Sequence, residues 1–384
     1  MICKRCGNKD PRYFYYGSKG YYCRKCVSFK RMLLEDDLNT FDYNVSQDSY
    51  EYNFDYPLTV YQQEISDKCA FNVQFKDVLL KAVCGAGKTE IVVESISNYL
   101  KRGLKVCYAI ARREVVIDLY QRFKTIFNNA DVVALYGGHH EKIYGDLIIC
   151  TTHQLFRYYQ NFDLLILDEV DAFPLSGNKE LMHIALNSCR GHIIFSTATT
   201  NDFLNDTLKD RDYIELNLFV RPSLKPLIVP TVKYNFKLIL IFELYVYLKK
   251  MKNQCIIFVS SKQLCLLLYR LFKKLINCTY VYSDLEDRDK NIMDFKDKKY
   301  QFIFATTVLE RGITIKDVFV VVLIFNKQVF DKSSLVQMLG RVGRNFNNPY
   351  GEAYILSSVY DKEITLAIDD IKEANRKYEL SVLW

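Results

Sequence analysis

The stretch Ala82-Val83-Cys84-Gly85-Ala86-Gly87-Lys88-Thr89 decides the fold of this chain of 384 residues. An apolar run at residues 78–80 precedes it, and a helical pattern at residues 91–96 follows it. A strand, a glycine-rich loop and a helix in this order bind nucleotide phosphates, because the glycines let backbone N–H groups face the phosphates. The predicted ATP-binding residues of this loop are Gly85, Ala86, Gly87, Lys88 and Thr89.

An acidic motif, Asp168-Glu169-Val170-Asp171, follows the apolar run at residues 164–167. We expect Lys88 to hold the β- and γ-phosphates of ATP, and Thr89 and Asp168 to hold Mg²⁺. Glu169 is then left to orient the attacking water. The alternative is a plain glycine-rich turn and an unrelated acidic loop. It is disfavoured because both motifs end predicted strands, where ligands bind in an open parallel sheet.

Four of the twelve cysteines form two Cys-x-x-Cys pairs, with residues 7–22 between the pairs. That interval is long enough for a hairpin that brings the pairs together, and four thiolates suit tetrahedral Zn²⁺ in a closed, structural site. Disulfides are disfavoured by a reducing compartment, and a redox motif would need only one pair. The remaining cysteines are expected to be small core residues. The predicted zinc ligands are Cys3, Cys6, Cys23 and Cys26.

Composition is typical of a globular protein that buries a sizeable core, with 49% hydrophobic and 25% charged residues. No apolar run is long enough to span a bilayer, and no apolar segment follows the basic N-terminus as in a secretory signal. We therefore expect a cytoplasmic protein, with peripheral attachment to the inner face of the cytoplasmic membrane left open. A net charge of +7 permits nucleic acid as a partner without requiring it.

Short apolar strands alternate with helical stretches along most of the chain, which predicts α/β domains with parallel sheets covered by helices. Three prolines between residues 222 and 230 interrupt the alternation, which resumes without a second phosphate loop. The length favours two domains and a smaller element. The predicted parts are a zinc module at 1–30, an acidic and polar linker at 31–55, an ATP-binding domain at 56–220 and a second α/β domain at 221–384.

The second predicted domain contains Gln337-Met338-Leu339-Gly340-Arg341-Val342-Gly343-Arg344. We expect Arg341 and Arg344, three residues apart, to share one helical face. Bidentate guanidinium groups suit the charge that spreads over the γ-phosphoryl oxygens in the transition state of hydrolysis. The alternative is an exposed arginine-rich helix without a catalytic role. The nucleotide site predicted in the first domain disfavours this alternative.

A series of short motifs runs along the chain. In chain order the motifs are Tyr61-Gln62, the phosphate loop, Ala111-Arg112-Arg113-Glu114, Cys150-Thr151-Thr152-His153-Gln154-Leu155, the acidic motif, Ser196-Thr197-Ala198-Thr199, Phe258-Val259-Ser260-Ser261, Ala305-Thr306-Thr307-Val308-Leu309-Glu310-Arg311-Gly312 and the arginine segment. This series resembles that of the superfamily 2 helicases. The cysteine module, the segment Asp168-Glu169-Val170-Asp171-Ala172-Phe173-Pro174 and the segment at residues 309–314 are similar, more narrowly, to the ComFA family of late-competence ATPases.

The resemblance implies two tandem RecA-like domains and an ATP-dependent translocase on single-stranded DNA. Such a translocase would drive transforming DNA into the cytoplasm, together with other competence proteins at a membrane channel. Gln62 would read adenine, and Gly312 would join the ATP site. DNA contacts would go to phosphates rather than bases, although a turn or a helix cap remains the alternative for each residue. The implied DNA-binding residues are Arg112, Thr151, Thr152, Ser260, Ser261, Thr306 and Thr307.

Two rival functions remain open. A replication-restart or repair helicase would separate duplexes, but the sequence has no obvious strand-splitting wedge. A zinc-bearing adaptor would use ATP only as a conformational switch, which the intact Glu169, Arg341 and Arg344 disfavour. The motif Asp168-Glu169-Val170-Asp171 departs from the Asp-Glu-Ala-Asp motif of RNA helicases, and those helicases have no comparable zinc module. Both differences weaken an assignment to RNA.

Overall fold

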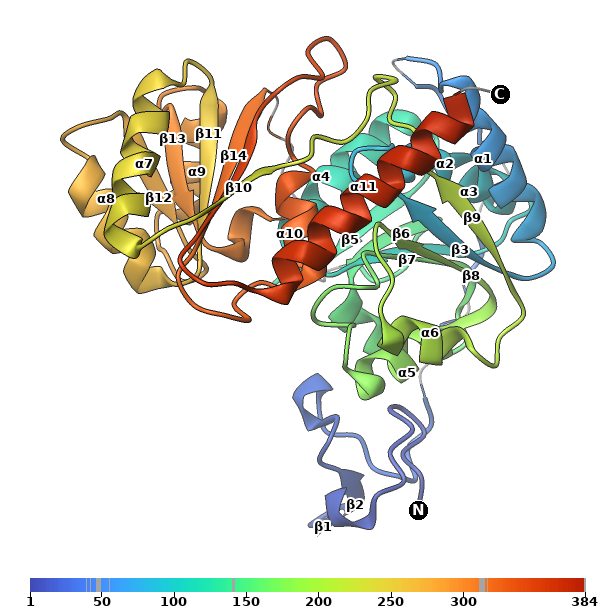
Figure 1. Cartoon of the computed structure of the whole chain (residues 1–384). Helices are drawn as coiled ribbons and strands as arrows, with labels where there is room; N and C mark the ends of the chain where they lie inside the picture. Colours follow the sequence, from blue (N-terminus) through green and yellow to red (C-terminus); the bar gives the residue numbers. More distant parts are fainter. Residues whose placement is uncertain are drawn as a thin grey trace. The chain divides into compact units, whose positions relative to one another are not determined.

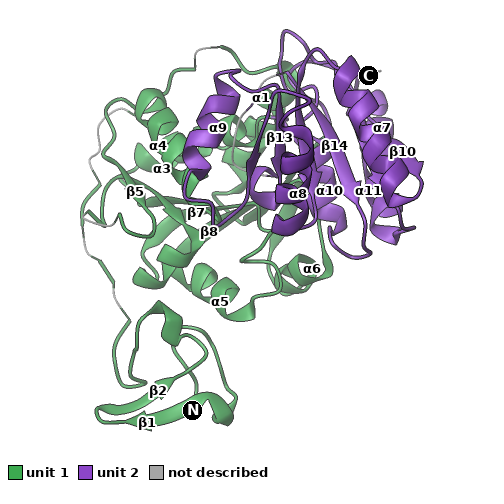
Figure 2. Cartoon of the chain, turned by 90° about the vertical axis from the view of Figure 1, so that its left-hand side faces the viewer, with its two compact units in different colours: residues 1–82, 87–218 green, residues 83–86, 219–384 purple. Residues whose placement is uncertain are grey.

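The computed structural model describes residues 1–38, 40–41, 43–45, 50–54, 56–139, 142–310, 315 and 317–382. The chain forms two compact units (Figure 2). Unit 1 comprises residues 1–82 and 87–218, and unit 2 comprises residues 83–86 and 219–384. Each unit is built on one parallel sheet with helices packed against it (Figure 1).

The sheet of unit 1 has the strand order β5-β6-β4-β7-β8-β3-β9, and all its pairs are parallel. Strands β4 and β6 are buried along their whole length, as expected for apolar runs that are covered on both faces. The strands are β3 (Asp77–Ala82), β4 (Val106–Ile110), β5 (Val132–Leu135), β6 (Leu147–Thr151), β7 (Phe162–Asp168), β8 (Cys189–Thr197) and β9 (Tyr213–Leu218).

Helices connect most of these strands, in the alternation that the sequence predicts. They are α1 (Val60–Asn72), α2 (Lys88–Ile91), α3 (Val93–Leu100), α4 (Arg113–Ile126), α5 (Lys179–Ser188) and α6 (Asp202–Leu208), with a 3₁₀ helix η3 (Thr152–Arg157) after β6. Parallel strands need such crossovers, so every strand of this seven-stranded sheet ends in a loop at the same edge. Loops at this edge hold the candidate nucleotide site.

The N-terminal cysteines lie before and after a small antiparallel hairpin within unit 1, with Cys23 as its last residue. Strands β1 (Phe14–Gly17) and β2 (Gly20–Cys23) pair with Phe14 opposite Cys23, between two short 3₁₀ helices, η1 (Pro11–Tyr13) and η2 (Val27–Phe29). Lys25 Nζ lies 2.6 Å from Glu180 Oε1 of α5. The segment that follows the hairpin therefore contacts a helix of the same unit.

The segment that the sequence predicts to be a linker is packed onto unit 1 in several places. Tyr50 is only 1% exposed, and its hydroxyl donates to Asp146 Oδ2 at 3.0 Å. The hydroxyl of Ser97 donates to the carbonyl of Tyr50 at 2.7 Å. Phe41 packs against the core cluster of the unit. Aromatic residues scattered through an acidic stretch thus cover part of the domain, which the composition of the stretch does not reveal.

The sheet of unit 2 has the strand order β10-β15-β14-β11-β13-β12, again with every pair parallel. Its strands are β10 (Thr231–Tyr234), β11 (Gln254–Val259), β12 (Cys278–Val281), β13 (Phe302–Ala305), β14 (Val318–Ile324) and β15 (Ala353–Ser357). Its helices are α7 (Lys237–Lys250), α8 (Lys262–Phe272), α9 (Arg288–Lys296), α10 (Lys332–Leu339) and α11 (Lys362–Val382), with a 3₁₀ turn η4 (Thr307–Leu309).

The predicted fold class is confirmed: two RecA-like parallel-sheet domains follow an N-terminal cluster of four cysteines. Within the described residues, no helix combines the length and the apolar character needed to cross a bilayer.

Candidate nucleotide site and metal centre

The predicted phosphate loop connects β3, which ends at Ala82, to α2, which begins at Lys88. Gly85 and Gly87 have φ angles of 81° and 86°, in the left-handed region that strains residues with a side chain. A Cβ at Gly87 would also lie 2.3 Å from Nε2 of Gln62. The second glycine is therefore required both by its backbone conformation and by the close approach of Gln62.

Gln62 is held in place by the first turn of α1. The N–H of Thr59 donates to Gln62 Oε1 at 3.0 Å, and the N–H of Gln62 donates to Thr59 Oγ1 at 3.3 Å. This capping box fixes the amide with Nε2 toward Gly87. Gln62 thus lies next to the phosphate loop, as the predicted ATP site requires, and its role in reading adenine stays a prediction.

Lys88 and Thr89 begin α2 and are partly buried. In the described part of the chain, no carboxylate lies within ion-pair distance of Lys88 Nζ. A partly buried ammonium group without a paired anion suits a phosphate, because the ligand would supply the missing negative charge.

Asp168 ends β7 at the same edge of the sheet and is 6% exposed. Its Oδ2 accepts a hydrogen bond from the hydroxyl of Tyr108 at 2.8 Å. Its Oδ1 accepts from the hydroxyl of Ser196 at 2.7 Å and from the N–H of Glu169 at 2.9 Å. Three donors therefore fix the orientation of this carboxylate before any metal binds.

Tyr108 is a residue of this site that the sequence analysis missed. It lies on β4 and is 1% exposed, and burial raises its pKa well above the ordinary value. The nearby side chain of Thr89 opposes this rise in pKa. The Tyr108 hydroxyl thus donates to Asp168 and lies near Thr89, the two side chains predicted to hold Mg²⁺. The sequence feature that could have indicated this role is the hydroxyl of Tyr108, the one polar group among the side chains of an otherwise apolar strand, β4.

Glu169 has a φ angle of 55°, a conformation that residues other than glycine rarely adopt. Such strain is often found at functional positions, and here it falls on the residue predicted to orient water. The hydroxyl of Thr199 donates to Asp171 Oδ2 at 2.7 Å. The end of β8 and the loop after it therefore contact both aspartates of the acidic motif, since Ser196 of β8 binds Asp168.

The predicted DNA-binding residues of unit 1 lie at one edge of its sheet. Arg112 precedes α4, Thr151 ends β6 and Thr152 begins η3, and β4 and β6 are parallel neighbours. Arg112 is partly exposed, but the side chain of Thr152 is fully buried. In this conformation the hydroxyl of Thr152 does not reach solvent.

The corresponding residues of unit 2 share an edge of the second sheet. Ser260 follows β11 and Thr306 follows β13, which are parallel neighbours. Ser261 caps α8, since its Oγ accepts from the N–H of Leu264 at 3.2 Å. Thr307 begins η4. The hydroxyl of Ser261 is therefore already used as a helix cap, while contact with nucleic acid remains a prediction for all four.

The prediction that Arg341 and Arg344 share a helical face is wrong. Helix α10 ends at Leu339, and Gly343 has a φ angle of 69°, which interrupts any continuation of the helix. Arg341 is 2% exposed, and Arg344 Nε donates to the carbonyl of Gly340 at 2.9 Å. Both arginines lie in the turns after the helix. Gly312 lies outside the described residues.

Arg221 is a second residue that the sequence analysis missed. It is 3% exposed, and its guanidinium donates to the carbonyls of Val342 at 2.9 Å and Gly340 at 3.0 Å. Burial, followed by the charge of Arg344, lowers the pKa of Arg221 to about 10. Arg221 therefore organises the backbone of the arginine segment. A single arginine in a proline-rich connection gave no signal of this role.

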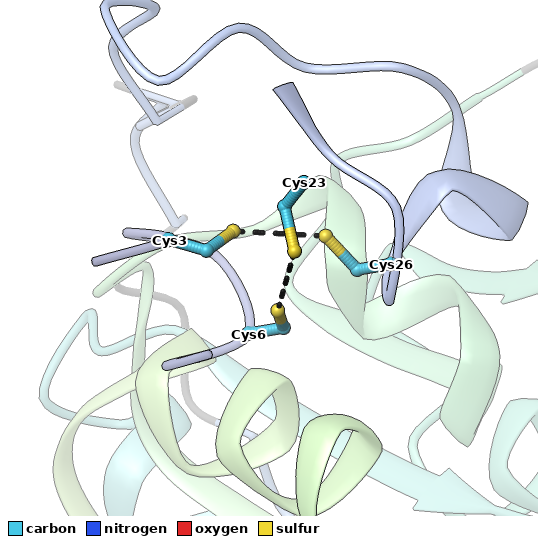
Figure 3. A group of neighbouring side chains, drawn as sticks. All are labelled: Cys3, Cys6, Cys23 and Cys26. Carbon is cyan, nitrogen blue, oxygen red and sulfur yellow. Dashed lines mark hydrogen bonds between the residues drawn. The ribbon is translucent and has the colours of Figure 1, made fainter. Parts of the chain in front are cut away.

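The four N-terminal cysteines converge from both ends of the hairpin (Figure 3). Their sulfurs lie 3.7 Å apart for Cys3 and Cys26 and 3.8 Å apart for Cys6 and Cys23. All four sulfurs lie within 4.8 Å of one another. A tetrahedral zinc ion with Zn–S bonds of about 2.3 Å places its sulfurs about 3.8 Å apart. The spacing of the four thiols therefore fits such an ion.

Two further side chains donate hydrogen bonds to these sulfurs. Arg5, 7% exposed, donates to Cys26 Sγ at 3.3 Å, and the amide of Asn8 donates to Cys23 Sγ at 3.6 Å. N–H donors directed at sulfur stabilise thiolates, which are the metal-binding form of cysteine. Both neighbours were missed because only the cysteine spacing was considered.

Comparisons with known proteins identify the family. Residues 59–207 match the DEAD/DEAH box helicase model, and residues 237–346 match the helicase conserved C-terminal domain. The competence protein ComFA of Streptococcus pneumoniae is 33% identical, over 98% of this chain and 91% of that protein. The chain therefore belongs to the ComFA family. ComFA of Bacillus subtilis is 32% identical, over 97% of this chain and 85% of its own length.

Solved structures agree with the fold. Saccharomyces cerevisiae Dbp5 bound to RNA and ADP BeF3 matches with a TM-score of 0.63 and 18% identity, over 81% of this chain and 87% of that one. RecG bound to a three-way DNA junction matches with a TM-score of 0.58 and 20% identity, over 85% of this chain and 45% of that one. As a ComFA-family member with two helicase domains, the chain is a helicase-like ATPase of superfamily 2, which implies ATP and Mg²⁺.

Proposed function

We propose that this protein is an ATP-dependent translocase on single-stranded DNA that drives transforming DNA into the cytoplasm. The observation that supports hydrolysis best is the carboxylate of Asp168, held by Tyr108, Ser196 and the N–H of Glu169. Membership of the ComFA family supports the role in DNA uptake, as a peripheral protein at the inner face of the membrane working with other competence proteins.

Each residue of the nucleotide site has a distinct task in this proposal. Lys88 binds the β- and γ-phosphates, and Gln62 together with Gly312 completes the ATP site. Thr89 and Asp168 would hold Mg²⁺, which neutralises charge on the phosphate oxygens.

Glu169 positions the attacking water and accepts its proton. The arginine segment of unit 2 supplies positive charge for the γ-phosphoryl oxygens, through Arg341 and Arg344.

The proposed DNA path follows the carboxyl edges of both sheets. Hydroxyls and backbone N–H groups there suit phosphates better than base edges, so binding should depend little on sequence. Because phosphates would supply most contacts, affinity should fall steeply as salt rises. The residues assigned to this path are Arg112, Thr151, Thr152, Ser260, Ser261, Thr306 and Thr307, with Thr152 limited to its backbone unless the loop rearranges.

We assign one structural zinc ion to Cys3, Cys6, Cys23 and Cys26. The sulfur spacing and the donors Arg5 and Asn8 support this assignment. A closed four-sulfur site leaves no open position for a substrate, so its contribution is to the folding of the hairpin.

Steady-state ATP hydrolysis, measured in parallel with single-stranded DNA, duplex DNA, RNA and no nucleic acid, tests the proposal. We expect Mg²⁺-dependent turnover that single-stranded DNA stimulates most. Equal rates with and without single-stranded DNA would contradict a DNA-driven motor. Stronger stimulation by duplex DNA would favour the helicase alternative, and an absence of turnover would favour an ATP-binding adaptor.

A further inference from the structure

We infer that the N-terminal cysteine module is itself a binding surface for single-stranded nucleic acid, with the hairpin β1–β2 as its centre. The choice of a DNA strand as the occupant rests on the proposed function. The surface is defined as residues 1–31 and carries contacts outside the motifs of the two helicase domains.

The charge of the chain is concentrated in this surface. Residues 1–31 contain nine Lys and Arg residues and a single Asp, a formal charge of +8, whereas the whole chain carries +7. The other 353 residues together are therefore close to neutral. A short segment that holds the entire positive excess is the electrostatic footprint expected for a polyanion.

Most of these cations are available to a ligand. In the described part of the chain, five of them have no ion-pair partner. Three others pair with single carboxylates, Lys4 with Asp37 at 3.6 Å, Arg12 with Asp10 at 2.7 Å and Lys25 with Glu180 at 2.6 Å. The unpaired cations, all exposed, are Lys9, Lys19, Arg24, Lys30 and Arg31.

Tyrosine rings lie between these cations on both faces of the hairpin. Tyr15, Tyr16 and Tyr21 are 54%, 68% and 45% exposed. Tyr16 and Tyr21 face each other across the strands with ring centroids 4.9 Å apart. Tyr15 pairs with Tyr22 on the opposite face, since side chains alternate along a strand.

Arginines are positioned over two of the rings. The guanidinium of Arg24 lies 5.3 Å from the ring centroid of Tyr15, and that of Arg31 lies 4.4 Å from the ring centroid of Tyr22. Stacked guanidinium groups keep their N–H donors free for phosphates, while exposed rings offer faces for bases. Alternating rings and cations match the alternating bases and phosphates of a single strand, where the bases are unpaired and accessible.

Full-length protein and a fluorescent 20-nucleotide oligo-dT test the inference. One variant combines Tyr16→Ala and Tyr21→Ala, and another combines Lys19→Gln and Arg24→Gln. The matched control, Lys209→Gln with Lys274→Gln, removes two exposed cations elsewhere. We expect the tyrosine variant to bind oligo-dT about tenfold more weakly. The Lys19/Arg24 variant should reduce the salt slope of log affinity by about 1.4, since each lost phosphate contact on a single strand contributes about 0.7.

The result that overturns the inference is wild-type affinity and an unchanged salt slope in both hairpin variants, with wild-type zinc content. Equal losses in the Lys209/Lys274 control would also overturn it, because nonspecific charge would then explain the effect. A third contradiction would be loss of binding to vesicles of anionic phospholipid with oligo-dT binding intact, which would make the surface a membrane contact. If the wild-type protein itself fails to bind oligo-dT, the result contradicts the proposed function, and with it the inference that rests on that function.

Discussion

The acidic motif of the nucleotide site and the cysteine module, both in unit 1, are stabilised in different ways. Asp168 ends a strand whose residues 164–167 are fully buried, and neighbouring strands supply the donors Tyr108 and Ser196. The module has two short strands and few buried side chains other than its cysteines. An apolar core positions the first site, whereas the second depends on four thiols that a metal would hold together. The two regions should therefore respond to different perturbations.

Lys88→Ala should produce the largest effect on hydrolysis. Loss of the Lys88 ammonium group removes the main contact proposed for the β- and γ-phosphates, so we expect weak ATP binding and turnover lower by about a thousandfold. Zinc content should stay at the wild-type value. Measurements of turnover and of fluorescent-nucleotide binding check this, and a Lys88→Ala variant that binds ATP normally would contradict the assignment.

Glu169→Gln should separate binding from hydrolysis. The amide cannot accept a proton from water, so turnover should fall by roughly a hundredfold while ATP binding persists. Rapid-quench hydrolysis together with equilibrium nucleotide binding measures both quantities. Normal turnover would remove Glu169 from its role.

Cys23→Ser should affect the module and spare the nucleotide site. Three thiolates hold zinc weakly, so the content should fall from about one ion per chain and the hairpin should lose its fold. Basal hydrolysis without DNA should persist. Native mass spectrometry gives the zinc content, and free thiols or a disulfide in a zinc-free wild-type protein would end the metal assignment. Loss of basal hydrolysis in a folded Cys23→Ser protein would show that the module supports catalysis directly, through its contact with α5.

Tyr108→Phe should have the smallest effect among these changes. It removes the hydroxyl that donates to Asp168 while retaining the ring. We expect the Mg²⁺ concentration for half-maximal nucleotide binding to rise about tenfold, the usual cost of losing a partner of a metal ligand. Affinity for nucleotide without Mg²⁺ should stay unchanged. A uniform loss of both affinities would indicate a purely structural role.

The sequence was sufficient to predict those parts of the structure that depend on residues close together in the chain. The glycines at 85 and 87 and the apolar strand that ends in Asp168 predict the phosphate loop and the parallel sheet. The paired cysteines predict the sulfur cluster. Each of these features is encoded by residues close together in the sequence. The sequence could not predict partners that come from distant strands, such as Tyr108 for Asp168. The helical spacing of Arg341 and Arg344 was misleading, because Gly343 adopts a left-handed conformation that no helix contains. The acidic composition of the predicted linker was misleading as well, because aromatic residues such as Tyr50 are buried against the domain.

Movement along single-stranded DNA is the central claim, and displacement of streptavidin from a biotinylated oligonucleotide tests it most directly. With biotin at either end of a 60-nucleotide strand and free biotin as a trap, wild-type protein with ATP and Mg²⁺ should release streptavidin from one end. Lys88→Ala and Glu169→Gln proteins should release none. ATP-independent release, or a lack of release from both ends by a protein whose ATP hydrolysis is stimulated by the same DNA, would contradict translocation.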